Sequence, residues 1–78
     1  MALSVEKLAA IRIELGTRAA LLEMEASCLR VDAECETLNP EAAGMRMKAA
    51  QICGVQAAQV RGLIACIEEE MGREEADT

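Results

Sequence analysis

Apolar residues in the first half of the chain recur at steps of three and four, the period of a helix with an apolar stripe. One such stripe, here called the inner stripe, consists of Leu8, Ile11, Leu15, Ala19, Leu22, Ala26, Leu29 and Ala33. It alternates large and small side chains, as packing against a second helix favours. Ser4 is a good N-cap, and only Gly16 interrupts the pattern. We therefore predict a helix over residues 4–38.

A second apolar stripe, the outer stripe, lies on nearly the opposite side of the same predicted helix. It consists of Ile13, Thr17, Ala20, Met24, Cys28, Val31, Cys35 and Leu38, again at steps of three and four. Charged residues fill the strips between the two stripes. A helix with two apolar stripes needs a neighbour on each side, and a hairpin supplies only one of them.

The single proline divides the chain almost at its midpoint. Proline fits the first turn of a helix and breaks a helix interior, because it lacks an N–H group. Asn39 precedes Pro40 as a candidate N-cap, and Glu41 places an anion in the first turn. We predict a turn at residues 38–40 and a second helix over residues 40–75, followed by an acidic tail at 73–78 that frays.

The second predicted helix carries its own apolar stripe, with Gln56 as the one polar member. Its members are Ala42, Met45, Ala49, Cys53, Gln56, Val60, Leu63, Ile67 and Met71. The predicted hairpin seam thus joins Leu8, Ile11, Leu15, Leu22 and Leu29 to Met45, Ala49, Cys53, Val60, Leu63 and Ile67. Small residues also recur in steps of four on the back of this helix, at Ala50, Gly54, Ala58 and Gly62. They indicate either a solvated alanine-rich face, which we favour, or a site where another backbone approaches closely.

The charges favour antiparallel helices. The net charge is −6, and residues 68–78 carry six acids and one base. If residue i faces roughly residue 79 − i, the acidic end of the first helix meets Arg46 and Lys48. Its basic start, with Lys7 and Arg12, then meets the acidic end of the second helix. The overall negative charge argues against nucleic acid and anionic membrane surfaces as ligands.

Composition predicts a single all-α domain, an antiparallel two-helix hairpin spanning residues 1–78 and resembling a coiled coil. There is no Phe, Tyr or Trp among the 78 residues, so the core relies on small aliphatic side chains. A chain of this size rarely gains more than about 3–5 kcal/mol from its own core. We expect a second copy or a larger helical protein to complete a helical bundle.

Catalytic and metal-binding patterns are missing from the sequence. There is no histidine, and no two of Cys28, Cys35, Cys53 and Cys66 are spaced as in a chelating pair. We predict that the protein is not an enzyme and holds no metal or cofactor, with its thiols free in a reducing compartment. The longest uncharged run, residues 49–60, is too short and too polar to span a bilayer. Glu6 and Lys7 interrupt any signal sequence, so a cytoplasmic protein is expected.

These features predict a small acidic interaction module, such as an adaptor, an assembly factor or an escort chaperone. Its partner-binding residues are the outer-stripe residues Ile13, Ala20, Met24, Cys28, Val31, Cys35 and Leu38. Two alternatives remain open. One is a homodimeric four-helix-bundle regulator, and the other is an acidic inhibitor of a larger protein that acts through the tail.

Overall fold

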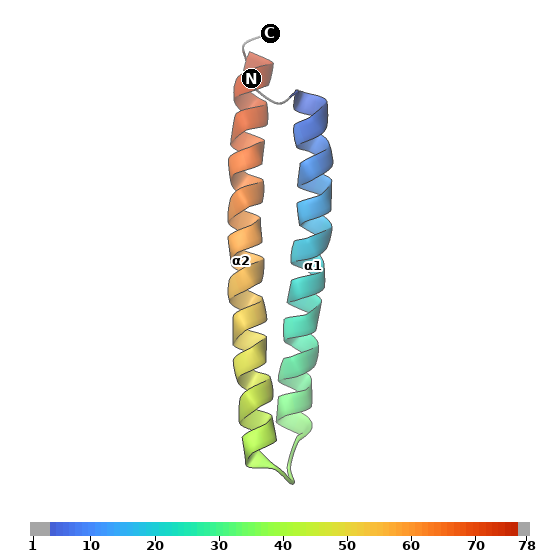
Figure 1. Cartoon of the computed structure of the whole chain (residues 1–78), viewed down its shortest axis with the longest axis vertical. Helices are drawn as coiled ribbons and strands as arrows, with labels where there is room; N and C mark the ends of the chain where they lie inside the picture. The colour runs from blue at the N-terminus through green and yellow to red at the C-terminus, as the bar shows by residue number, and fades with distance from the viewer. Residues whose placement is uncertain (1–3, 77–78) are drawn as a thin grey trace.

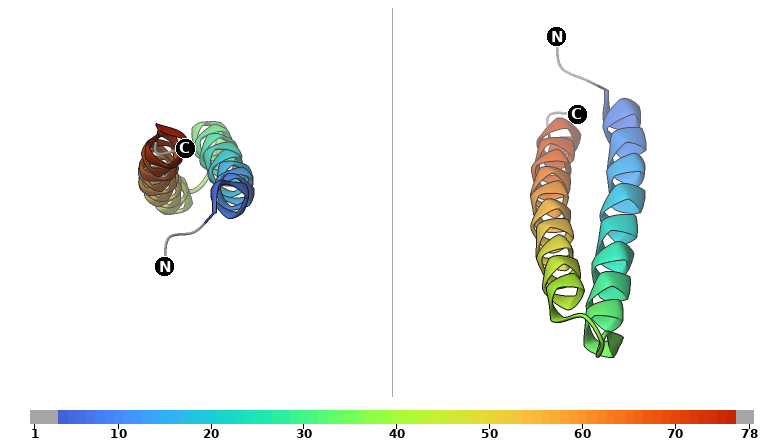
Figure 2. Two further views of the ribbon diagram at one scale, coloured as in Figure 1. Left: turned by 90° about the horizontal axis from the view of Figure 1, so that it is seen from above. Right: turned by 60° about the horizontal axis from the view of Figure 1, so that its bottom comes forward.

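A computed structural model, which describes residues 4–76, shows two long helices packed against each other as a hairpin (Figure 1). Helix α1 spans Val5–Cys35, and helix α2 spans Pro40–Ala76. The helices run antiparallel and lie side by side over the length of a molecule measuring 61 × 17 × 14 Å (Figures 1 and 2). The all-α antiparallel hairpin predicted from the sequence is confirmed.

Helix α1 begins where the sequence predicts and ends earlier. The Ser4 hydroxyl oxygen accepts a hydrogen bond from the Lys7 backbone N–H at 3.3 Å, which makes Ser4 the N-cap. The last helical residue is Cys35 rather than Leu38, because Glu36 has an extended backbone. Leu38 therefore belongs to the turn, and its place on a helical stripe was predicted wrongly.

The Glu36 side chain explains the early end of α1. One carboxylate oxygen, Oε1, accepts hydrogen bonds from the backbone N–H groups of Leu38 and Asn39, each at 3.1 Å. The other, Oε2, accepts a 2.9 Å bond from the Arg46 guanidinium on α2. A single carboxylate thus satisfies two free N–H groups of the turn and ties the turn to the opposite helix. These bonds also lower the pKa of Glu36, with the Arg46 bond as the largest cause.

Helix α2 begins at Pro40 as predicted. The Asn39 side-chain oxygen, Oδ1, accepts a hydrogen bond from the Ala42 N–H at 3.1 Å and so caps the helix. At the other end the helix continues through Ala76, so the predicted fraying is not seen over residues 73–76. The Arg73 guanidinium bonds to the Glu70 carboxylate at 2.7 Å, which supports this last part of the helix. The remainder of the predicted tail lies outside the described residues.

One row of buried and half-buried positions runs along each helix at strictly alternating steps of three and four. The row on α1 is Val5, Leu8, Arg12, Leu15, Ala19, Leu22, Ala26, Leu29 and Ala33, and it continues to Glu36 just after the helix. The row on α2 is Ala43, Arg46, Ala50, Cys53, Ala57, Val60, Ile64, Ile67, Met71 and Glu74. A sustained repeat of this kind is the signature of coiled-coil packing. Five of the eight residues buried in the described structure are alanines.

Two ion pairs across the hairpin set the register of the two rows. Glu36 pairs with Arg46 at 2.9 Å, and Glu23 pairs with Arg61 at 2.7 Å. The residue numbers of paired residues add up to slightly more than the 79 predicted from the sequence: 82 for Glu36 and Arg46, and 84 for Glu23 and Arg61. The reason is that side chains on both helices lean toward the N-terminus of their own helix. In this register Ala26 lies level with Ala57, and leucine-containing levels alternate with these alanine levels.

The predicted seam is placed correctly on α1 and partly wrongly on α2. On α2, Ala49, Cys53, Val60 and Ile67 are half-buried, whereas Met45 and Leu63 are 66% and 56% exposed. The buried line runs instead through Ala50, Ala57, Ile64 and Met71. Each of Met45 and Leu63 belongs to a second apolar row that lies beside the buried one. Spacing alone does not separate two adjacent rows on one helix.

Replacement of a buried isoleucine tests the core. Ile64 is 8% exposed, and Ile64→Ala should lower the free energy of unfolding by about 2–4 kcal/mol, because it leaves a cavity at the helix interface. The matched control is Ile52→Ala, also on α2, where the side chain is 59% exposed and the change should stay within about 0.5 kcal/mol. Urea unfolding measures both. Equal losses for the two variants would contradict the register.

The pH dependence of stability tests the Glu36 contacts. A carboxyl whose pKa is lowered by folding stabilises the protein above its ordinary pKa of about 4.3, and this contribution is lost as the pH falls through the lower folded pKa. Glu36→Gln should therefore melt at a lower temperature than the wild-type chain at pH 7. The difference should shrink as the pH falls below about 4.3. A difference in melting temperature that stays constant from pH 7 to pH 3 would argue against these bonds.

Candidate protein-protein interaction surface

The side of α1 that faces away from α2 carries an uncovered apolar surface, here called the outer face. Its seven members are Ile13, Thr17, Ala20, Met24, Cys28, Val31 and Cys35, and all seven are exposed. The large ones are well exposed, with Ile13 at 68% and Met24 at 62%. Leu38, the eighth residue of the predicted stripe, is 93% exposed in the turn rather than on the helix. The outer face therefore spans most of α1.

Thr17 is the one member of the outer face with a hydroxyl group. Its Oγ1 donates a hydrogen bond to the Ile13 carbonyl oxygen, 3.2 Å away in the preceding turn. Burial of a hydroxyl in an apolar interface is costly when its hydrogen bond is lost. Because Thr17 already has a partner within its own helix, another helix can cover the outer face without leaving this donor unsatisfied.

Two ion pairs within the hairpin hold some of the charged residues on the flanks of the outer face. Arg18 pairs with Glu14 on α1 at 3.9 Å, and Arg61 reaches across from α2 to Glu23 at 2.7 Å. The Arg61 hydrogen bond lowers the pKa of Glu23, and the same bond raises the pKa of Arg61. These exposed pairs contribute at most about 1 kcal/mol each, so their main effect is on orientation.

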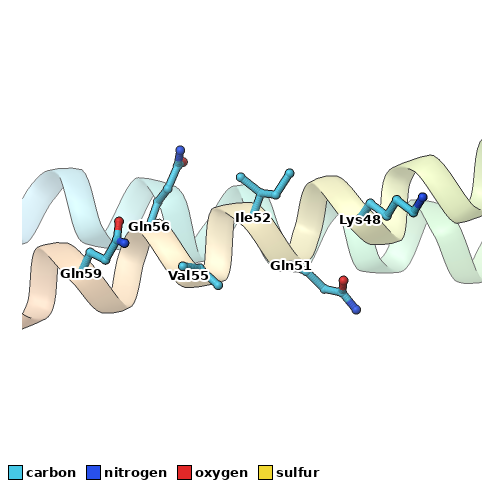
Figure 3. A pocket seen from close by; sticks show the side chains of 6 residues that line it. All are labelled: Lys48, Gln51, Ile52, Val55, Gln56 and Gln59. Atoms are coloured by element: carbon cyan, nitrogen blue, oxygen red, sulfur yellow. The ribbon is translucent and has the colours of Figure 1, made fainter.

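Helix α2 carries a second exposed apolar surface that the sequence analysis missed. Met45, Ile52, Val55 and Leu63 are each more than half exposed. Ile52 and Val55 line a shallow depression of about 490 Å³ with Lys48 and three glutamines, all on α2 (Figure 3). The sequence does contain a pattern for this surface, a row of residues at alternating steps of four and three. The stripe predicted from the sequence combined members of this row with members of the buried row. The row consists of Met45, Ala49, Ile52, Gln56, Gln59, Leu63 and Cys66. The glutamines make this surface more polar than the outer face.

The stripe of small residues does not lie on the back of α2. Ala50 is buried and Gly54 is half-buried, whereas Ala58 and Gly62 are exposed. A step of four residues advances about 40° around a helix, so the row winds from the interface out to solvent. Gly54 and Ala58 line an open groove between the helices, about 560 Å³ in volume, with Glu23, Ser27, Arg30 and Arg61 among its other lining residues.

The described residues hold no group of three or more His, Cys, Asp or Glu side chains that is arranged as a set of metal ligands. The four cysteines are free thiols. Helix α2 is long and apolar enough to cross a membrane by length and composition, with 17% of its most apolar stretch buried. A single helix of this kind is weak evidence for a membrane span, because the test uses only length and composition.

No protein-family model matches the chain, and comparison with curated proteins and with solved structures finds no significant similarity. Its class is therefore defined by its own geometry. It is a helical hairpin with a coiled-coil interface rich in alanine and with a long apolar face that the hairpin does not cover.

Substitution of Gly62 tests whether the small-residue row needs its glycines. A Cβ atom built at Gly62 meets no atom within 4 Å. Gly62→Ala should therefore raise the free energy of unfolding by about 0.5–1 kcal/mol, because alanine is the better helix former. Urea unfolding gives the value, with Ala65→Gly as the reverse substitution at an exposed alanine on the same helix. Destabilisation by Gly62→Ala would indicate that another backbone approaches α2 at this position.

Proposed function

We propose that this protein is a non-enzymatic interaction module that binds another helix through the outer face of α1. The observation that carries the proposal is the exposure of all seven outer-face residues on one side of a continuous helix. Helix-in-groove and helix-on-helix recognition use anchors at this spacing. An adaptor, an assembly factor or an escort for a larger protein needs only such a face and no catalytic group.

The composition of the core supports the same proposal. The buried residues are Leu8, Ile64, Met71 and five alanines, and none of the large side chains is completely buried within the described structure. Burial of a large aliphatic side chain contributes about 1.5–3 kcal/mol, and alanine contributes far less. The hairpin alone therefore gains little from its own interface. Coverage of Ile13, Met24 and Val31 by a partner would add burial that the single chain lacks.

Methionine at the centre of the outer face suits a binding role. Met24 is unbranched and flexible, so it can adjust to the shape of an opposing side chain. Small neighbours at Ala20 and Cys28 allow the backbone of a partner helix to come close on either side of it. The face thus combines one adaptable large residue with two shallow positions.

A charge placed at the centre of the outer face tests the proposal. Met24→Asp should weaken any complex about tenfold or more, because a carboxylate would be buried without a partner. The hairpin should keep its helical content, because residue 24 is exposed. The matched control, Gln59→Asp, adds the same charge on an exposed position of α2.

Complex formation is measured by sedimentation for self-association and by quantitative pull-down from the native host for other proteins. Circular dichroism checks the helical content of each variant. A wild-type chain that forms no complex sensitive to Met24→Asp in either measurement would refute a binding role for the outer face.

A further inference from the structure

The outer face of α1 has a spacing that reads the same in both directions. From Ile13 through Thr17, Ala20, Met24, Cys28 and Val31 to Cys35, the steps are four, three, four, four, three and four. A helix with this spacing, turned end for end about Met24, presents apolar positions at the same levels. We infer that the helix bound by the outer face is α1 of a second copy of this chain, antiparallel to the first, with a two-fold axis at Met24.

This inference rests on the proposed function and names its partner. In the antiparallel arrangement all seven outer-face positions meet one another. Met24 meets Met24 of the second copy at the axis, Ala20 meets Cys28, Thr17 meets Val31, and Ile13 meets Cys35. A two-fold interface requires one surface to be self-complementary, and this spacing meets that requirement. The product is a four-helix assembly with the two α1 helices at its centre.

Charge selects the antiparallel direction over the parallel one. Residues 5–20 carry a net charge of +1, from Glu6, Lys7, Arg12, Glu14 and Arg18. Residues 28–35 at the end of α1 carry a net charge of −1, from Arg30, Asp32 and Glu34, and Glu36 beyond them is already bound to Arg46. A parallel pair would set each acidic segment beside its own copy. In the antiparallel pair, the acidic segment of each copy lies beside the basic segment of the other. This arrangement favours the antiparallel direction and adds little to the affinity between copies.

Specific charges lie at matching levels in the antiparallel pair. Arg12 of one copy comes within two residues of the level of Glu34 of the other, and Arg18 comes within two residues of the level of Asp32; the two-fold axis repeats both matches. Within the hairpin, Arg18 already pairs with Glu14 at the long distance of 3.9 Å, and Glu23 is held by Arg61. Of the two carboxylates that flank Met24 in the sequence, Glu23 is therefore paired within each copy, whereas Glu25 is not part of that ion pair.

Cysteine cross-linking measures both the register and the direction. The four native cysteines are first replaced by alanine, and single cysteines are then placed at residues 17, 24 and 31. In the antiparallel pair, position 24 meets itself, whereas two copies of position 31 are separated by 14 residues of helix, about 21 Å. A disulfide needs Cα atoms within about 7 Å. Gln59→Cys on α2 serves as the control for random collisions.

We expect Met24→Cys to cross-link under mild oxidation with at least about a tenfold higher yield than Val31→Cys or the control. An equal mixture of Thr17→Cys and Val31→Cys chains should cross-link far better than either chain alone, to about half the yield of Met24→Cys, because half of randomly paired dimers hold one chain of each kind. Equal yields from the three single outer-face variants would indicate a parallel pair and overturn the inference. Yields no higher than the control, with a monomer in sedimentation, would overturn it too. In that case, the proposed function would still hold if the wild-type chain captured a different protein and Met24→Asp abolished that capture.

Discussion

The placing of buried alanine opposite buried alanine, in the half of the hairpin nearest the turn, is the constraint on which the structure depends. Ala26 and Ala33 on α1 lie level with Ala57 and Ala50 on α2, and all four are buried. Alanine favours the helix itself more than any other residue, but it buries little area against a neighbour. The sequence thus specifies two stable helices with little buried apolar surface between them. Several larger apolar side chains, such as Ile13 and Met24 on α1 and Ile52 on α2, are left on the outside of the hairpin.

Most of the fold can be predicted from local chemistry. The caps at Ser4 and Asn39 act through side-chain bonds to N–H groups three residues ahead, so they can be recognised in the sequence. The inner stripe on α1 is equally readable, because charged strips separate it from the outer stripe. The end of α1 was harder to predict, since it depends on the Glu36 bond to Arg46, which lies ten residues further along the chain.

The surface of α2 shows where pattern reading fails. Two apolar rows lie side by side on this helix, and no charged residue divides them between residues 49 and 60. Periodicity identifies a helix in this case but does not select the row that faces α1. Near the turn the row that faces α1 is the one with the small side chains: Ala50 and Ala57 are buried, and the bulkier Met45 and Ile52 remain outside. Such a choice depends on both helices at once.

If a second copy covers the outer face of α1, as we infer, the hairpin obtains much of its stability from that contact. The melting temperature should then depend on chain concentration, because an associating protein melts at a higher temperature when it is more concentrated. We expect a melting temperature that rises steadily from low micromolar to millimolar chain concentration. A melting temperature that is the same across this range would contradict it.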